Sequence, residues 1–133
     1  MSEKLASLKQ KGGGNLTETT LWTNSSPTSG FNASNVTLSD STNNYKYIKI
    51  YWRTSTSNST IGSIIIDKDT WDTMTEASNH PKAGIAAYTN SATHNRIIFK
   101  VSATEIRVGL CYQVGASTYS ANNVIPTKIC GLK

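Results

Sequence analysis

An unbroken run of β-favouring residues from Tyr45 to Arg53 constrains this sequence more than any other feature. Strand side chains point alternately to the two faces of a sheet, so residues two apart share a face. Ile48, Ile50 and Trp52 therefore fall on one side of the predicted strand. We expect this apolar side to face the core and the strand to be central to the fold.

The other side of the same strand is aromatic and basic, and it supplies the candidate ligand-binding residues. These are Tyr47, Lys49, Tyr51 and Arg53. Aromatic rings stack on sugars or bases, and cationic side chains donate hydrogen bonds to hydroxyl, carboxylate or phosphate oxygens. The same residue types also suit a second buried face or a subunit contact, where a lysine stem packs and its ammonium reaches the edge. From the residues alone, both interpretations stay open.

The composition favours an all-β domain. A chain of 133 residues suits one domain with its own core. Ser, Thr and Asn supply about a third of the residues, and charged residues only 16%, compared with about 25% in an average domain. Hydroxyl and amide side chains compete with the backbone hydrogen bonds of a helix, so they favour strands and turns.

Short β segments separated by turn residues predict one antiparallel β-sandwich, with jelly-roll-like topology, over residues 15–133. Residues 1–14, which end in three glycines, are predicted to form a flexible or short helical tether. One short helix is expected near residues 69–78, where apolar residues recur at helical spacing. Besides 45–53, the expected strands are 20–23, 35–38, 61–67, 83–89, 96–102, 105–112 and 124–132.

Two local features need separate expectations. Residues 90–95 are polar, and we predict that they form a loop in which His94 is exposed. Pro126 lies inside the last predicted strand. Because proline cannot donate a hydrogen bond to a sheet, that strand is expected to lie at an edge or to contain a bulge.

The formal net charge of +5 and the pI near 9.3 favour an anionic partner, such as nucleic acid, a phosphate-bearing wall polymer or an acidic glycan. Cys111 and Cys130 are the only cysteines, and no secretory leader opens the chain, so free thiols are expected rather than a disulfide. The longest aliphatic run, Ile64 to Ile66, is far shorter than the ~20 apolar residues of a membrane span. A soluble protein with no membrane partner is expected.

No arrangement of residues indicates an enzyme. A nucleophile needs a base within reach, and no Gly-x-Ser-x-Gly elbow occurs. His80 and His94 are the only histidines and are expected in exposed loops. The one acidic cluster is best explained as solvated acids at a helix start, rather than as glycosidase carboxylates or a calcium loop. It consists of Asp67, Asp69, Asp72 and Glu76. No catalytic residue, metal or cofactor is predicted.

Three motifs and one hairpin stand out along residues 20–133. The motifs are Leu21-Trp22-Thr23-Asn24 followed by Pro27-Thr28-Ser29 and Phe31, the strand Val36-Thr37-Leu38-Ser39, and the ending Ile125-Pro126-x-x-Ile129-x-Gly131-Leu132-Lys133. With the predicted hairpin from Arg96 to Val108, they resemble a small domain found in tail and other minor structural proteins of phages and prophages of gut Firmicutes. Such domains usually end a longer fibre or baseplate protein.

This resemblance implies an all-β, homotrimeric module of a virion that contacts other tail proteins. It also implies a role in host recognition but fixes no ligand. Our hypothesis for the ligand is a bacterial surface polysaccharide, either a glycan or a teichoic-acid-like polymer. The resemblance assigns no binding residue. Two alternatives stay open: a purely structural virion assembly module, and a single-stranded nucleic-acid binder. The latter would stack bases on Tyr47 and Tyr51 and bind phosphates with Lys49 and Arg53.

Overall fold

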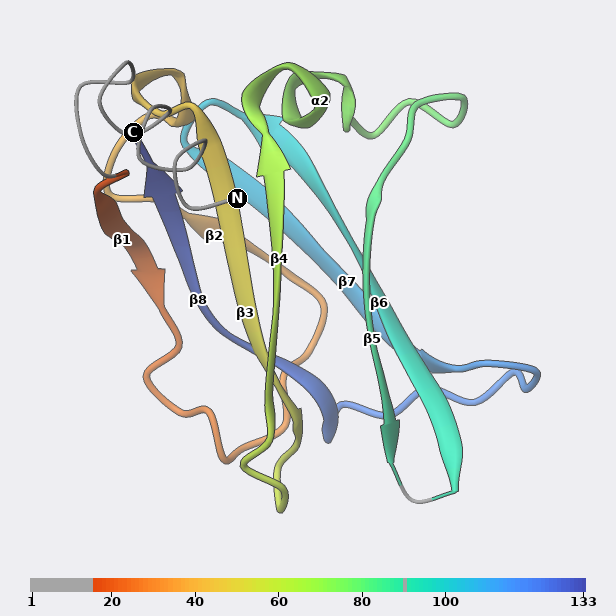
Figure 1. Ribbon diagram of the computed structural model, residues 1–133. Coiled ribbons are helices and arrows are strands. Elements are labelled where there is room, and N and C mark those ends of the chain that lie inside the picture. Colours follow the sequence, from red (N-terminus) through yellow and green to blue (C-terminus); the bar gives the residue numbers. More distant parts are fainter. Residues whose placement is uncertain (1–15, 90) are drawn as a thin grey trace, which may run out of the picture.

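The computed structural model describes residues 16–89 and 91–133, and in it two antiparallel sheets pack face to face (Figure 1). The strands of the first, which we name sheet A, are β1 (Glu18–Thr23), β3 (Tyr47–Ser55), β4 (Ile61–Asp67) and β8 (Asn123–Leu132). They are hydrogen-bonded in the order β1-β8-β3-β4. The predicted tether at residues 1–14 lies outside the described residues.

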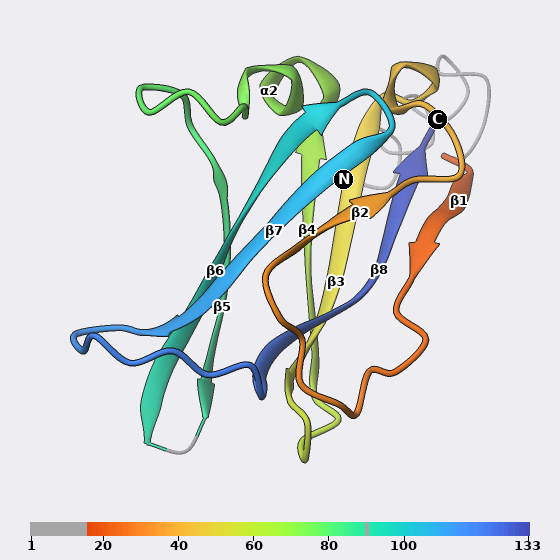
Figure 2. The same ribbon diagram turned by 180° about the vertical axis from the view of Figure 1, so that it is seen from behind.

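The second sheet, sheet B, has the order β2-β7-β6-β5 (Figure 2). Its strands are β2 (Ser34–Thr37), β5 (Ala83–Thr89), β6 (Ala92–Ser102) and β7 (Glu105–Gln113). Pairing of β1 with β8 and of β2 with β7 gives the nested, long-range strand pairs of a jelly-roll-like fold. Sequence neighbours β3 and β4 form a hairpin, as do β5, β6 and β7 in succession. The predicted all-β sandwich is confirmed.

The apolar side of β3 forms the centre of the core, as its alternation predicts. Ile48 and Ile50 are fully buried and Trp52 is almost so. Ile98 and Ile106 meet them from sheet B and are also fully buried. Each fully buried aliphatic side chain contributes roughly 1.5–3 kcal/mol relative to an exposed one, so this two-sided cluster accounts for much of the stability of the fold.

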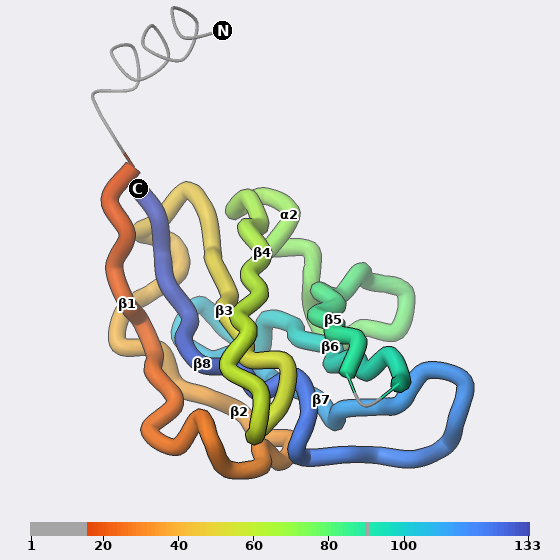
Figure 3. Tube along the Cα trace, turned by 60° about the horizontal axis from the view of Figure 1, so that its bottom comes forward, coloured from red at the N-terminus to blue at the C-terminus, as the bar shows by residue number. Residues whose placement is uncertain are grey.

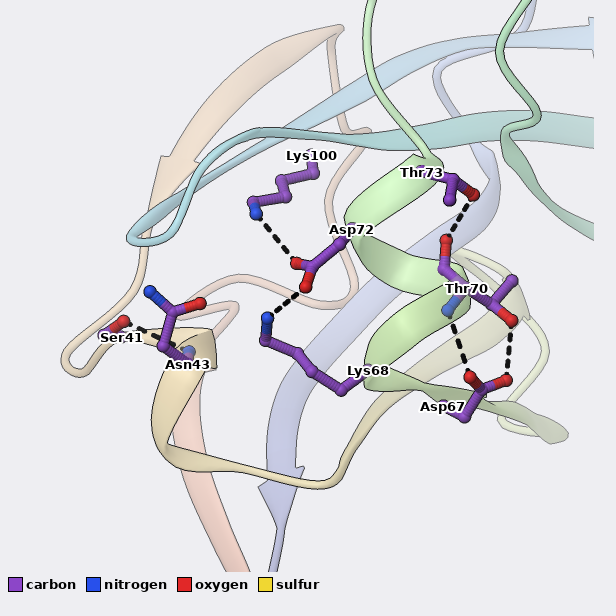
Figure 4. Close-up of polar contacts among 8 residues, drawn as sticks. All are labelled: Ser41, Asn43, Asp67, Lys68, Thr70, Asp72, Thr73 and Lys100. Carbon is purple, nitrogen blue, oxygen red and sulfur yellow. Dashed lines mark hydrogen bonds and ion pairs between the residues drawn. The ribbon is translucent and has the colours of Figure 1, made fainter.

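One short helix, α2 (Lys68–Thr73), connects the two sheets. Asp67 caps its first turn by accepting hydrogen bonds from the backbone N–H and the hydroxyl of Thr70, at 3.0 and 2.7 Å (Figure 4). Trp71 points into the core and is fully buried. The helix was expected near 69–78, but it ends at Thr73 because the chain then turns to reach β5.

Asp72 fastens α2 to sheet B, as Figure 4 shows. Its carboxylate pairs with the ammonium groups of Lys68, one turn earlier, and of Lys100 on β6, the latter at 2.8 Å. Burial alone would raise the pKa of Asp72, but hydrogen bonds from Lys100 and Lys68 outweigh burial and leave the pKa below its ordinary value. The acids near the helix start therefore act as a cap and as an ion pair.

The predicted polar loop is wrong over residues 92–95, which belong to a strand, and so is the expected exposure of His94. Strand β6 begins at Ala92, and His94 lies on its inner face with only 5% exposed. Thr93 and Asn95 point the other way, so the strand alternates although all these residues are polar. Polarity concealed the alternation because the inward positions are histidine and arginine instead of aliphatic residues.

Arg96 is the next inward residue of β6, and its guanidinium is completely buried. It donates hydrogen bonds to backbone carbonyls from three separate segments, and its guanidinium lies 5.5 Å from the ring centroid of Phe31. Burial lowers the pKa of Arg96. The accepting oxygens are those of Val124 (2.6 Å), Phe31 (2.7 Å), Gly109 (3.0 Å), Asn123 (3.2 Å) and Ala121 (3.4 Å). This one side chain thus joins the β1–β2 connection, β7 and the start of β8.

Pro126 occupies a bulge, one of the two environments expected for it. Strand β8 is an inner strand of sheet A, between β1 and β3, so the edge alternative does not apply. The register between β3 and β8 shifts between Tyr51 and Trp52, where Trp52 pairs with Pro126. The bulge accommodates a residue that has no N–H to donate.

The two ends of the described chain lie side by side (Figure 3). Thr17 and Lys133 exchange backbone hydrogen bonds of 2.8 and 3.1 Å, which extend the β1–β8 ladder by one more pair. Among the described residues, no helix is long and apolar enough to cross a membrane.

Candidate functional site

All four sequence-predicted binding residues lie on the outer face of sheet A, half-buried among their neighbours. The alternation of β3 places them there, opposite the core residues Ile48 and Ile50. The structure brings Lys49 and Tyr51 together with two residues from other strands. Arg53 makes separate contacts near one end of the strand, and Tyr47 lines a depression near the other.

Tyr51 is the centre of a four-residue group that we name the Tyr51 cluster, comprising Glu18, Lys49, Tyr51 and Lys128. The ammonium groups of Lys49 and Lys128 lie 4.6 and 4.5 Å from the centroid of the Tyr51 ring. The Tyr51 hydroxyl donates a 2.7 Å hydrogen bond to Glu18. Glu18 also lies 3.7 Å from the Lys49 ammonium and 3.8 Å from that of Lys128.

The cluster carries two positive charges against one negative charge. Interaction with Tyr51 raises the pKa of Lys49, with a smaller contribution from Glu18, so this lysine is fully charged at neutral pH. The two ammonium groups also occupy space over the Tyr51 ring that a stacked base or sugar would need. The chemistry available here is therefore attraction of an anion by two convergent lysines.

Arg53 and Tyr47 do not join this cluster. The guanidinium of Arg53 donates to the carbonyls of Ser55 (3.3 Å) and Thr56 (3.5 Å), next to the β3–β4 connection. Tyr47 lies at the other end of β3 and lines an open depression of about 320 Å³ with Asp67 and other residues near the start of α2. The four predicted residues therefore share a face without forming one site.

Sequence reasoning missed Glu18 and Lys128 as members of the site. Lys128 pairs with Tyr51 across the β3–β8 ladder, and β1 lies on the other side of β8. Alternation within the last strand indicates that Lys128 and Ile129 face opposite sides. That signal places Lys128 on an outer face, but only the strand order places it beside Tyr51.

The described residues contain no group of three or more His, Cys, Asp or Glu side chains that could hold a metal ion. His80 is exposed and its Nδ1 lies within hydrogen-bonding distance of the Thr75 hydroxyl, whereas His94 points into the core. Asp67 and Asp72 are engaged at α2.

Both cysteines are free thiols, as predicted. Cys111 lies inside sheet B, and Cys130 is fully buried on β8. Burial raises the pKa of each thiol, so the reactive thiolate is scarce at neutral pH. Cys111 therefore acts as a small apolar side chain of the core, and Cys130 is covered on the outer side of sheet A, where its thiol lies 3.8 Å from the Thr20 hydroxyl.

Comparison with models of known protein families finds no match to this chain, and no functionally characterised protein matches it either. The observations that bear on function are therefore the fold, the Tyr51 cluster and the sequence resemblance described above.

Proposed function

We propose that this protein is a non-enzymatic virion component that helps a phage or prophage particle contact its bacterial host. In this proposal the outer face of sheet A binds an anionic surface polymer, of the acidic-glycan or teichoic-acid type, and other tail proteins hold the domain on the particle. The observation that carries the binding role is the convergence of Lys49 and Lys128 on Tyr51, where Glu18 is the one opposing carboxylate among the described residues. The sequence resemblance supports the virion role.

A flat, basic sheet face suits a repeating polyanion better than a compact ligand. Ion pairs between the two lysines and anionic groups of the polymer would be exposed to solvent, and each would contribute only about 0.2–1 kcal/mol. One copy of the domain would therefore bind weakly. A homotrimer would present three such faces to one polymer, and the linked sites would raise the overall affinity without further contacts. Self-association is therefore part of this proposal.

The test removes the two lysine charges and measures binding to purified bacterial cell walls. We expect the double variant K49Q/K128Q to bind about tenfold more weakly, since two weak ion pairs together supply ~1.4 kcal/mol. Walls stripped of phosphate polymers by acid extraction should lose the same binding. Sedimentation of fluorescently labelled protein with the walls gives the affinity.

The matched control is K46Q/K133Q, which removes the same charge from exposed lysines that lie outside the cluster. It should keep near-normal binding. Equal weakening in both double variants would indicate unspecific attraction to the basic protein, and unchanged binding in K49Q/K128Q would refute the site.

A purely structural role in assembly is the second candidate, and the outer face of sheet B favours it. Large apolar side chains are exposed there and on the adjoining β7–β8 connection, namely Tyr88, Ile97, Val101, Leu110, Tyr112, Val114 and Tyr119. Contact with other copies of the chain would cover them. Sedimentation equilibrium separates the two roles: a trimer that ignores every wall preparation favours assembly alone.

A further inference from the structure

A second depression lies on the opposite sheet. A depression of about 280 Å³ on the outer face of sheet B is lined by Asn35, Glu76, Phe99, Val101 and Arg107. These residues come from three neighbouring strands and from the connection between α2 and β5. None of them belongs to the Tyr51 cluster.

The connection that forms one wall of this pocket is held in place by Lys82. Its ammonium donates to the carbonyls of Thr75 and Ala77, both at 2.9 Å, and of His80 at 3.2 Å. The same ammonium lies 5.4 Å from the centroid of the Phe99 ring. Lys82 therefore holds the segment that carries Glu76 beside the Phe99 ring. The α2–β5 connection that forms this wall of the pocket is thus fixed by hydrogen bonds within the protein.

The pocket offers hydrogen-bond donors and acceptors next to apolar surface. Arg107 Nη1 donates to Asn35 Oδ1 at 3.2 Å, which leaves most of its N–H groups available. Asn35 in turn donates to Glu105 at 3.3 Å. Within residues 16–89 and 91–133, the exposed carboxylate of Glu76 has no hydrogen-bond or ion-pair partner. Phe99 and Val101 supply the apolar part.

Charge balance distinguishes this pocket from the Tyr51 cluster. The positive charges of Lys82 and Arg107 are matched by the negative charges of Glu76 and Glu105. A neutral pocket favours neither anions nor cations. A carboxylate, a guanidinium and an amide beside an aromatic ring suit a molecule whose hydroxyl groups both donate and accept and whose C–H face is apolar.

We propose that this pocket binds one neutral pyranose unit of a polysaccharide. The C–H face of the sugar lies against Val101 and the part of the Phe99 ring that the Lys82 ammonium leaves open, and its hydroxyl groups bond to Arg107, Glu76 and Asn35. The site does not depend on the anion-binding role of sheet A, because it uses another face of the molecule and a ligand without charge.

The experiment is a nuclear magnetic resonance titration of the whole chain with neutral methyl glycosides of glucose, galactose, mannose and N-acetylglucosamine, with glucuronic acid as the charged comparison. At least one neutral glycoside should shift the amide signals of Phe99, Val101 and Arg107 in a saturable way. The variant F99L keeps an apolar residue and removes the ring, and we expect it to bind about tenfold more weakly.

Y112L is the matched control, because it also replaces a ring on the outer face of sheet B but lies outside the pocket. It should bind like the unaltered protein, as should K49Q/K128Q, so failure here and failure of the proposed function are distinguishable. No saturable shift at the pocket with any glycoside, equal loss in F99L and Y112L, or preference for glucuronic acid would overturn the proposal.

Discussion

Replacing Arg96 with methionine is expected to lower the free energy of unfolding by about 4 kcal/mol or more. The substitution keeps the long apolar stem but removes the buried guanidinium, which donates to five backbone carbonyls. The Ala121 carbonyl would still accept from the backbone N–H of Phe31, whereas the other four carbonyls would lose this donor, and each buried group left unsatisfied costs about 1–3 kcal/mol. Since small domains are stable by only roughly 5–15 kcal/mol, much of the stability would be lost.

Urea unfolding followed by tryptophan fluorescence measures this loss. Arg53→Met is the matched control, because Arg53 also donates to two carbonyls but is half-exposed, and we expect a change below about 1 kcal/mol. If R96M does not fold, R96K still gives a value: it keeps the charge but offers three donors in place of five, so an intermediate loss is expected. Substitutions at exposed sites usually change the free energy of unfolding by less than about 1 kcal/mol. A change that small in R96M would contradict the prediction.

Replacing Trp71 with alanine is the second large effect, with an expected loss of about 3–5 kcal/mol. Trp71 is fully buried and is the only buried residue of α2. A helix this short is not stable alone, since isolated helices below ~12 residues are marginal in water. Without the indole, we expect α2 to detach and the Asp72–Lys100 ion pair to open, which faster hydrogen exchange of the α2 amides would report.

Trp71→Phe separates packing from hydrogen bonding. The indole N–H has no hydrogen-bond partner among the described residues, so phenylalanine removes volume but no polar contact. We expect a loss of about 1–2 kcal/mol, well below that of W71A. Equal losses in the two variants would show that an undetected polar partner of the indole holds the helix instead of its packing.

The strands that could be predicted from the sequence are those with aliphatic residues facing the core. The bounds of β4 and β5 were predicted correctly, and the side of β3 that faces the core follows from its alternation alone. The prediction succeeds for these strands because apolar residues at every second position mark the face of a strand that is buried in the core. That Pro126 would lie at an edge or in a bulge could also be predicted locally, because a proline has no N–H to donate and this restricts its position in any sheet.

The start of β6 could not be predicted because its buried residues are polar. Residues 92–95 are polar, as in a loop, so the predicted strand began only at Arg96, and the burial of Arg96 depends on the carbonyls of distant segments. The candidate site was limited in the same way. Its face could be predicted from β3, whereas the meeting of Tyr51 with Lys128 and Glu18 depends on strand order, which no local pattern contains.

The hydrogen-bonded pair Thr17 and Lys133 has an architectural consequence. Any polypeptide joined ahead of Leu16 or behind Lys133 leaves the sandwich at a single pole, and the β1–β2 and β3–β4 connections occupy the opposite pole (Figure 1). A domain with adjacent termini can be inserted into a surface loop of a larger protein. It can also be circularly permuted, because a linker between the two termini does not have to cross either sheet. When the domain is attached to another protein at this end, the β1–β2 and β3–β4 connections point away from that protein.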